Sequence, residues 1–314
     1  MELIRGLHNL RARHHGCVAS IGNFDGVHRG HRQVLELLKE EAAARGLPST
    51  VIAFEPTPRE FFEAVPPARL TNLREKYEAL AAVGIDRFLA LCFDERLRGM
   101  TAEEFVETIL TDGLGVRFLS VGSDFRFGQD RSGDYETLKQ AGEQHGFEVA
   151  AAEDFLINAE RVSSSAIRRY LSAGELDMAR TMLGRYYRMS GRVVCGEQLG
   201  RELGYPTVNI RIERSVSPVQ GIFAVCVSGA GLEQHPAVAS VGTRPTVDGK
   251  EFLLEVHLFD IERDLYHEYL NIDFVKKLRD EMKFSSMAAM RLQMEEDEAS
   301  ARVVLDALKG RQTR

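Results

Sequence analysis

Two histidines and three glycines follow a short apolar run near the start of the chain. Residues 22–31 read Gly-Asn-Phe-Asp-Gly-Val-His-Arg-Gly-His, directly after the apolar residues 17–21. The apolar residues that come next recur at helical spacing: Val34, Leu37, Leu38 and Ala42. The start of a helix presents unbonded backbone N–H groups and the positive end of the helix dipole, which both favour an anion. His28 and His31 can add ring N–H donors, so the pattern predicts a phosphate-binding turn between a strand and a helix.

Serines and arginines in residues 162–171 form a second candidate phosphate site. Ser164 and Ser165 precede a helical run, where serine is a preferred N-cap. Arg168 and Arg169 place positive charge near the helix start, which the dipole disfavours by roughly 0.3–1 kcal/mol each. A bound triphosphate would reverse that sign, whereas the alternative is a pair of solvated arginines.

Two further loops follow predicted strands. The first holds four residues of interest: Asp124, Phe125, Arg126 and Phe127. Aromatic rings beyond a strand end are not expected to join the core, and the arginine between them can bind an anion or stack. A hydrophobic plug is the alternative. The second loop, Phe-Glu-Pro-Thr-Pro at 54–58, is typical of a rigid connection.

A charged loop in the second half of the chain holds three glycines: Gly196, Gly200 and Gly204. Glycines there allow the backbone to wrap around a polyphosphate. The loop ends in Pro-Thr-Val-Asn, and Thr207 and Asn209 alternate onto one face of the strand that begins there. A hydroxyl and an amide oxygen suit a hard cation such as Mg²⁺, although this short pattern also occurs at ordinary strand starts.

Glu255 lies in a predicted strand at 251–259 with a clear two-residue period. Phe252, Leu254, Val256 and Leu258 share one face of that strand. Glu255 and His257 then lie on the other face. By itself this carboxylate is either a solvated strand residue or a general base.

Composition limits the classes of protein to consider. The chain has 314 residues, 44% of them hydrophobic, and a net charge of −7 without long basic runs, which argues against a nucleic-acid partner. No apolar stretch approaches the roughly 18 residues of a membrane span or forms a signal peptide, so we expect a cytoplasmic protein without a membrane partner. The cysteines are isolated, and we expect small buried residues rather than disulfides or a zinc site: Cys17, Cys92, Cys195 and Cys226.

The periodicity changes near residues 184–188. Before that point, predicted strands at 17–22, 50–54, 86–92, 117–122 and 147–152 alternate with predicted helices at 31–45, 71–83, 101–112 and 134–145. This alternation predicts an α/β domain with a parallel, Rossmann-like sheet and ligands at the carboxyl ends of its strands. Beyond it, predicted strands at 190–195, 207–212, 221–227, 236–241, 251–259 and 269–275 indicate a small antiparallel β-barrel. A terminal helix at 286–308 closes the chain, with a core-facing stripe predicted at Met287, Met290, Met294, Ala301, Leu305 and Leu308.

The motifs together resemble the bacterial bifunctional riboflavin kinase and FMN adenylyltransferase family, the FAD synthetases. The Gly-x-Phe-Asp-Gly-x-His-x-Gly-His turn and the Ser-Ser-x-x-Ile-Arg segment resemble the two-part signature of nucleotidyltransferases, and the 191–209 segment resembles riboflavin kinase. Three positions depart from the usual form of the family: Thr57 and Cys195 stand where histidine is common, and Val208 replaces alanine. The resemblance implies an FMN adenylyltransferase domain at 1–184 and a riboflavin kinase domain at 185–314.

The resemblance also implies roles for residues in both halves. In the first, ATP would be bound by Gly22, Phe24, Asp25, Gly26, Gly30, Ser164 and Ser165, with His28, His31 and Arg168 acting in catalysis. Asp124, Phe125, Arg126 and Phe127 would bind flavin, and Gly196, Gly200 and Gly204 would bind nucleotide in the second half. Glu255 matches the base of the kinase, with Thr207 and Asn209 as ligands of Mg²⁺.

The implied partners are small molecules: riboflavin, FMN, FAD, ATP, ADP and pyrophosphate. The oligomeric state stays open, a homo-oligomer included. Two other interpretations remain at this stage. The chain could be a monofunctional adenylyltransferase with a non-catalytic flavin-binding barrel, or a flavin-sensing regulator without turnover.

Overall fold

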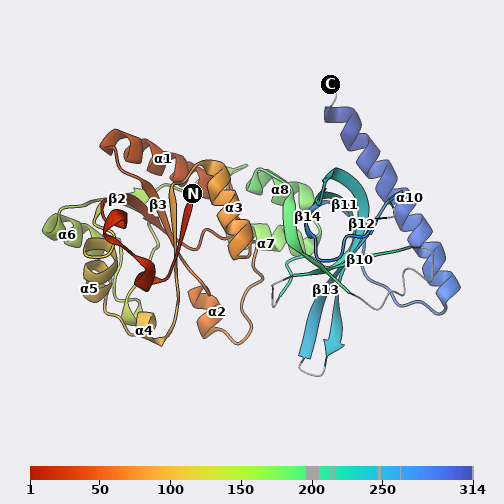
Figure 1. Ribbon diagram of the computed structural model, residues 1–314, viewed down its shortest axis with the longest axis horizontal. Helices are drawn as coiled ribbons and strands as arrows, with labels where there is room; N and C mark the ends of the chain where they lie inside the picture. The colour runs from red at the N-terminus through yellow and green to blue at the C-terminus, as the bar shows by residue number, and fades with distance from the viewer. Residues whose placement is uncertain (196–204, 213, 215, 247–248, 262, 313–314) are drawn as a thin grey trace. The chain divides into compact units, whose positions relative to one another are not determined.

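The computed structural model describes residues 1–195, 205–212, 214, 216–246, 249–261 and 263–312 (Figure 1). The chain divides into two compact units. One consists of Met1–Pro67 and Leu73–Ser163, and the other of Ala68–Asn72 and Ser164–Arg314. The first unit is an α/β structure, and the second contains a closed β-barrel.

The first unit is built on a six-stranded sheet in which every pair is parallel, in the order β1-β4-β3-β2-β5-β6. Its strands are β1 (Glu2–Arg5), β2 (Cys17–Ile21), β3 (Ser49–Phe54), β4 (Arg87–Leu91), β5 (Val116–Gly122) and β6 (Glu148–Ala152). Every residue of β2 and β3 is buried, as expected for central strands covered on both faces. The five predicted strands are confirmed, and β1 is an additional edge strand.

Helices cover both faces of this sheet (Figure 1). On one face, α1 (Arg29–Arg45) and α3 (Leu73–Val83) bury apolar side chains against β2 and β3. On the other lie α5 (Ala102–Phe105), a π-helical turn (Val106–Thr111) and α6 (Tyr135–His145). The helix predicted at 101–112 is therefore split in two. Shorter elements complete the unit: α2 (Pro58–Phe62), α4 (Glu95–Arg98), β7 (Leu156–Ile157) and β8 (Glu160–Arg161).

The second unit contains a closed antiparallel barrel in the order β10-β13-β12-β11-β14-β9. Its strands are β9 (Tyr187–Val194), β10 (Val208–Arg211), β11 (Gly221–Gly229), β12 (Leu232–Thr246), β13 (Gly249–Leu258) and β14 (Tyr269–Arg279). Alternate residues fill the interior, among them the fully buried Phe223, Val225, Leu254, Val256 and Ile272. The antiparallel barrel predicted from turn spacing is confirmed.

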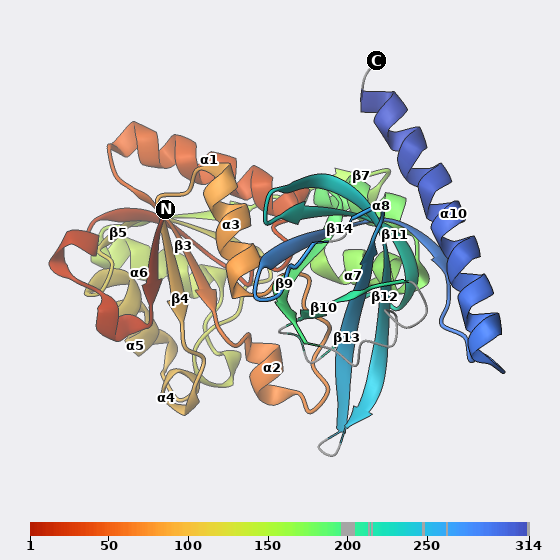
Figure 2. The same cartoon turned by 45° about the vertical axis from the view of Figure 1, so that its right-hand side comes forward.

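The described residues of the barrel unit include the helices α7 (Ser164–Ala173), α8 (Leu176–Leu183) and α10 (Met287–Gln312). Figure 2 shows α10 running along the outside of the barrel. Its later turns bury Ala301 and Leu305 against Ala224 of β11, as predicted. The predicted stripe is wrong at the start of the helix, where Met287 is 52% exposed. Further along the helix, Arg279 Nε and a terminal guanidinium nitrogen donate hydrogen bonds to the Asp297 carboxylate, at 2.8 and 2.6 Å.

The cysteines differ more in exposure than the sequence predicts. Cys17 is fully buried and Cys226 half-buried, but Cys92 and Cys195 are exposed, so the expectation of four buried thiols is wrong for these two. Burial raises the pKa of the Cys17 thiol to about 11, and burial also raises the pKa of Cys226 to about 11.

We expect iodoacetamide to label Cys92 and Cys195 in the native protein at pH 8 and to leave Cys17 and Cys226 largely unmodified. Only the thiolate reacts, and a pKa near 11 leaves roughly one thiolate in a thousand at that pH. Peptide mass spectrometry after timed labelling measures the four rates. Labelling of Cys17 as fast as Cys92 would contradict this account of the core.

Candidate active sites

The turn between β2 and α1 is buried and has an unusual backbone. Phe24 and Val27 have φ angles of 47° and 40°, and Gly26 has a φ of 86°. Left-handed values such as these cost a non-glycine residue on the order of 1–3 kcal/mol, and such residues cluster at functional sites. Val27 is β-branched and fully buried, so its surroundings impose this conformation. The predicted turn between strand and helix is confirmed.

The two histidines of this turn lie against each other at the start of α1. His28 is the N-cap, and its Nδ1 accepts a hydrogen bond of 3.2 Å from the backbone N–H of His31. A neutral His28 ring therefore carries its proton on Nε2. The two rings stack with centroids 3.6 Å apart, and the Phe24 ring lies 5.1 Å from that of His31. The fold thus gathers imidazole N–H groups at a helix N-terminus, where an anion is favoured.

Gly30 allows a close approach of the chain just before α7. A Cβ at this position would lie 3.3 Å from His28 Nδ1 and 3.4 Å from the Val162 carbonyl oxygen. Gly22 is similarly close to Phe24, whose ring would be 3.2 Å from an added Cβ. A side chain at either position would therefore be tightly packed against the turn.

Ser164 is the first residue of α7 and Ser165 the second, so both lie inside the first turn of the helix and do not precede it, contrary to the prediction of an N-cap. In the same helix, Arg168 Nε donates a 2.6 Å hydrogen bond to the Ala68 carbonyl. This arginine thereby contacts the 68–72 segment, a contact between residues 100 positions apart that the sequence does not reveal. The guanidinium of Arg169 lies over the Tyr170 ring instead.

The aromatic loop after β5 combines a buried and an exposed part. Phe127 is only 5% exposed and packs on Phe105 in the core, so the expectation that neither ring joins the core is wrong for this residue. Phe125 stacks on Phe127 at 5.7 Å. The exposed Arg126 donates to Asp134 at 2.6 Å. The buried ring therefore anchors the loop.

Asp124 is exposed at the same loop, with Arg161 3.8 Å from its carboxylate. Thr57, where the resembling family commonly has histidine, is the N-cap of α2. Its hydroxyl and backbone N–H both donate to the Glu60 carboxylate, at 2.9 and 2.8 Å. The expected rigid loop therefore continues into a short capped helix, a capping box that Thr-x-x-Glu indicates.

In the barrel, backbone register brings Asn209 and Glu255 together. Asn209 of β10 is paired with Glu255 of β13, which is in turn paired with Ser240 of β12. Directly opposed residues of antiparallel strands share a face, with Cβ atoms about 4.5–5.5 Å apart. Asn209 is 7% exposed and Glu255 half-buried. A buried amide, a carboxylate and a hydroxyl therefore form a row on the outer face, while Leu254 and Val256 face the interior.

Ser240 is a residue of this row that the sequence analysis missed. It lies far from Asn209 and Glu255 in sequence, and no local pattern reveals which strands of a barrel become neighbours. Thr207 lies just before β10 and is half-buried. Gly196, Gly200 and Gly204, predicted to bind nucleotide, lie outside the described residues.

The oxygen donors at β10 fit a hard cation. Within the described part of the chain, no three His, Cys, Asp or Glu side chains form a metal-binding group. Asn209 lies on the row with Glu255, and Thr207 lies two residues earlier, just before the strand begins. Neutral oxygens next to a carboxylate suit Mg²⁺, which is bound by few protein ligands together with phosphate oxygens.

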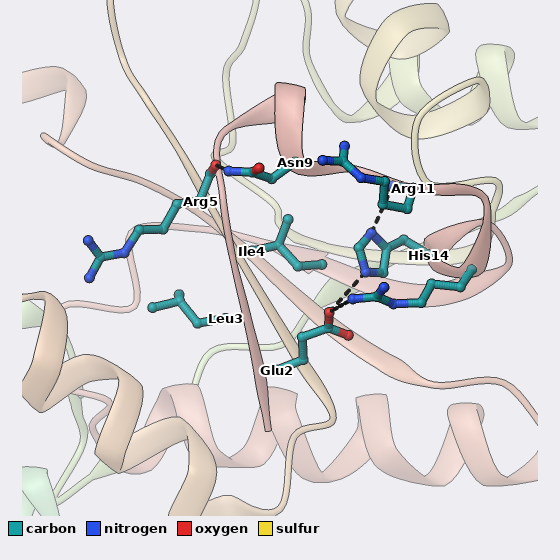
Figure 3. Close-up of a pocket in the computed structure, with 8 residues that line it drawn as sticks. Glu2, Leu3, Ile4, Arg5, Asn9, Arg11 and His14 are labelled. Atoms are coloured by element: carbon teal, nitrogen blue, oxygen red, sulfur yellow. Dashed lines mark hydrogen bonds and ion pairs between the residues drawn. The ribbon is translucent and has the colours of Figure 1, made fainter.

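A separate pocket lies at β1. Figure 3 shows the His14 ring next to the Glu2 carboxylate, at 3.1 Å. The Arg13 guanidinium lies 2.5 Å from the same carboxylate. Hydrogen bonds from Arg13 and His14 lower the pKa of Glu2. None of the predicted site residues that the structure describes lines this pocket. The contacts of Glu2 with Arg13 and His14 hold the edge strand β1 against the segment that leads into β2.

Two family descriptions match successive parts of the chain. The FAD synthetase family matches residues 10–166, and the riboflavin kinase family matches residues 183–305. The bifunctional riboflavin kinase/FMN adenylyltransferase of Escherichia coli K12 is 47% identical over 304 residues, which cover 96% of this chain and 97% of that protein. The enzyme of the same name from Pseudomonas fluorescens is 48% identical over 307 residues, covering 97% and 98%.

A solved structure has the same fold over nearly the whole chain. It is the crystal structure of a protein named as a macrolide-efflux protein from Streptococcus pneumoniae, with a TM-score of 0.82 and 28% identity, covering 96% of this chain and 99% of that one. Among the helices described here, none combines the length and apolar character of a membrane span. The presence of both catalytic domains favours two activities over a single activity or a purely regulatory role.

The chain therefore belongs to the bifunctional riboflavin kinase/FMN adenylyltransferase family, whose C-terminal domain phosphorylates riboflavin to FMN and whose N-terminal domain joins FMN to the AMP of a second ATP, giving FAD and pyrophosphate.

Proposed function

We propose that the row of Asn209, Glu255 and Ser240 is the centre of the kinase reaction and that the turn at 22–31 is the centre of adenylyl transfer. The boundary between the two functional domains is proposed at residues 184/185, close to residue 183, where the riboflavin kinase match begins. We also propose a cytoplasmic location, because both reactions consume ATP.

The kinase step needs a base, and the register of β10 and β13 supports Glu255 in that role. The nucleophile is the 5′-hydroxyl of riboflavin, which is neutral and weak until its proton is removed. Glu255 would accept this proton as the hydroxyl oxygen bonds to the γ-phosphorus of ATP and the bond to the ADP oxygen breaks. The single observation that carries the assignment is the direct pairing of Glu255 with the buried Asn209.

Thr207 and Asn209 would hold Mg²⁺. When bound, the cation would offset the negative charge of the phosphates in this step. The backbone of Asn209 is paired with Val194 on one side and with Glu255 on the other. Its amide oxygen would therefore need little reorganisation to bind the cation.

Adenylyl transfer needs no base. The attacking phosphate oxygen of FMN is already anionic; it bonds to the α-phosphorus of ATP as pyrophosphate leaves. The remaining requirement is charge stabilisation, which the imidazole N–H groups of His28 and His31 and the amides of the α1 N-terminus would provide. Ser164, Ser165 and Arg168 are proposed to bind the ATP phosphates, and the exposed Asp124 and Arg126 with Phe125 the flavin. Phe127 would support Phe125 from the core.

Single substitutions in the two sites should separate the two activities. We expect His31→Ala to lower FAD formation from FMN by about 10²–10³-fold, the usual cost of one preorganised donor, and to leave FMN formation from riboflavin intact. We expect Glu255→Gln to lower FMN formation by about 10²–10⁴-fold and to leave FAD formation from supplied FMN intact. Initial rates by chromatography of the flavins measure both steps.

His8→Ala and Glu233→Gln are matched controls, since both change exposed side chains of the same type in the same units. Both should retain the two activities. Loss of both steps together in either site variant would contradict the proposed division.

Asn209→Ala should raise the Mg²⁺ concentration for half-maximal riboflavin phosphorylation by about tenfold or more, because one oxygen ligand is lost. The Mg²⁺ dependence of FAD formation should not change. Calorimetric titration of ADP with and without Mg²⁺ gives a readout independent of turnover. Asn271→Ala, in β14 of the same barrel, is the control, and an unchanged Mg²⁺ response in Asn209→Ala would rule out this ligand.

A further inference from the structure

His257 makes a long-range contact that the kinase chemistry does not use directly. Its ring Nδ1 lies 2.9 Å from the carbonyl oxygen of Pro206. A carbonyl only accepts hydrogen bonds, so Nδ1 carries the proton and donates it. Pro206 precedes Val208, the first residue of β10. The hydrogen bond from β13 therefore holds the chain just before the strand ladder begins.

The position of this contact matters because the Pro206 carbonyl and the backbone nitrogen of Thr207 belong to one peptide bond. A peptide unit is planar, so a fixed carbonyl oxygen also fixes the plane that leads into Thr207. The Tyr205 ring adds a second contact, packing against the His257 ring with centroids 5.1 Å apart. Two successive residues before Thr207 thus depend on a single imidazole.

The other side of the imidazole faces α10. His257 Nε2 lies 3.9 Å from a carboxylate oxygen of Glu298. The other oxygen of Glu298 accepts from the Arg302 guanidinium at 2.7 and 2.9 Å. Arg302 also donates two hydrogen bonds to Asp260, at 2.8 and 2.9 Å. A chain of polar contacts therefore runs from α10 to His257 and on to the segment before β10.

We propose that His257 is a positioning residue of the kinase site, which holds the Pro206–Thr207 peptide so that Thr207 is presented next to Asn209 and Glu255. The proposal rests on the roles proposed above for these three residues. His257 and Glu255 are two residues apart in β13 and lie on the same face, so one strand segment carries both the base and the group that orients the cation ligand. Neither histidine nitrogen touches substrate in this role.

Two substitutions separate the hydrogen bond from the packing of the ring. His257→Phe keeps the ring and removes the donor. His257→Asn keeps a donor near the place of Nδ1 because its side-chain amide lies at the same distance from the backbone. We expect His257→Phe to weaken binding of ADP with Mg²⁺, and to raise the KM for ATP in riboflavin phosphorylation, by roughly three- to tenfold, the usual effect of one hydrogen bond. The kcat should change less than the KM, and His257→Asn should recover most of the affinity.

His235 provides a matched control for loss of barrel stability. Its Nε2 donates a 2.8 Å hydrogen bond to the Phe259 carbonyl, so His235→Phe removes the same type of contact from β12 of the same barrel. We expect this variant to bind ADP with Mg²⁺ as the unsubstituted protein does, even if its Tm falls as far as that of His257→Phe. All variants should form FAD from supplied FMN at the normal rate.

The proposal is tested by measuring three quantities on the full chain: the calorimetric affinity for ADP with Mg²⁺, the steady-state constants and the Tm. Unchanged affinity in His257→Phe would overturn it. Equal losses in His257→Phe and His257→Asn, or in His257→Phe and His235→Phe, would also overturn it, because ring packing or stability would then explain the effect. Full kinase activity in Glu255→Gln would refute the proposed site itself, which makes the two failures distinguishable.

Discussion

The register of the barrel strands is the constraint on which the proposed kinase site depends. Side chains alternate along a strand, so a slip of one residue between β10 and β13 would move Asn209 into the interior and bring Ile210 opposite Glu255. The apolar residues prevent this slip. Ile210 and Leu254 are paired one position further along and are buried inside the barrel, where a polar side chain would lose its hydration. The hydrophobic interior therefore also sets the geometry of the polar row outside it.

The proposed sites of the two units differ in the groups that they present to the charge of ATP. The parallel sheet directs the end of β2 into the start of α1, where two stacked imidazoles lie at the helix N-terminus. The strained φ angles of Phe24 and Val27 belong to this arrangement, and the burial of Val27 holds them. In the described part of the barrel, the polar row consists of an amide, a hydroxyl and a carboxylate on paired strands. This difference matches the chemistry, because an alcohol must lose a proton to react and a phosphate already carries its charge.

Much of the fold was predictable because local pattern and tertiary environment agree. Buried parallel strands such as β3 are continuously apolar, and the barrel strands alternate, so both signals are local. The edge strand β1 was missed because it is short, and the π-helical turn at 106–111 was missed because its sequence continues a helical pattern. The predictions of burial for Phe127 and Met287 were wrong for a common reason. Whether a side chain beyond a strand or at a helix end is buried depends on partners distant in sequence.

The same difference between local and long-range information applies to the candidate sites. The motif residues themselves could be identified in the sequence, but their partners could not. Pairing of Ser240 with Glu255, the hydrogen bond of Arg168 to Ala68 and that of His257 to Pro206 all join residues far apart in the chain. Thr57 is an exception, since Thr-x-x-Glu is a local signal for the helix cap that it forms.

The central claim is that one chain carries out two successive ATP-dependent reactions on the same flavin. The most direct test is a time course of the purified protein with riboflavin, ATP and Mg²⁺, with riboflavin, FMN and FAD separated by chromatography. The account predicts that FMN appears first and is then converted to FAD, with ADP and pyrophosphate as the other products. If FMN accumulates without FAD, or if supplied FMN becomes FAD while riboflavin is untouched, the chain performs only one of the two reactions and the claim is wrong.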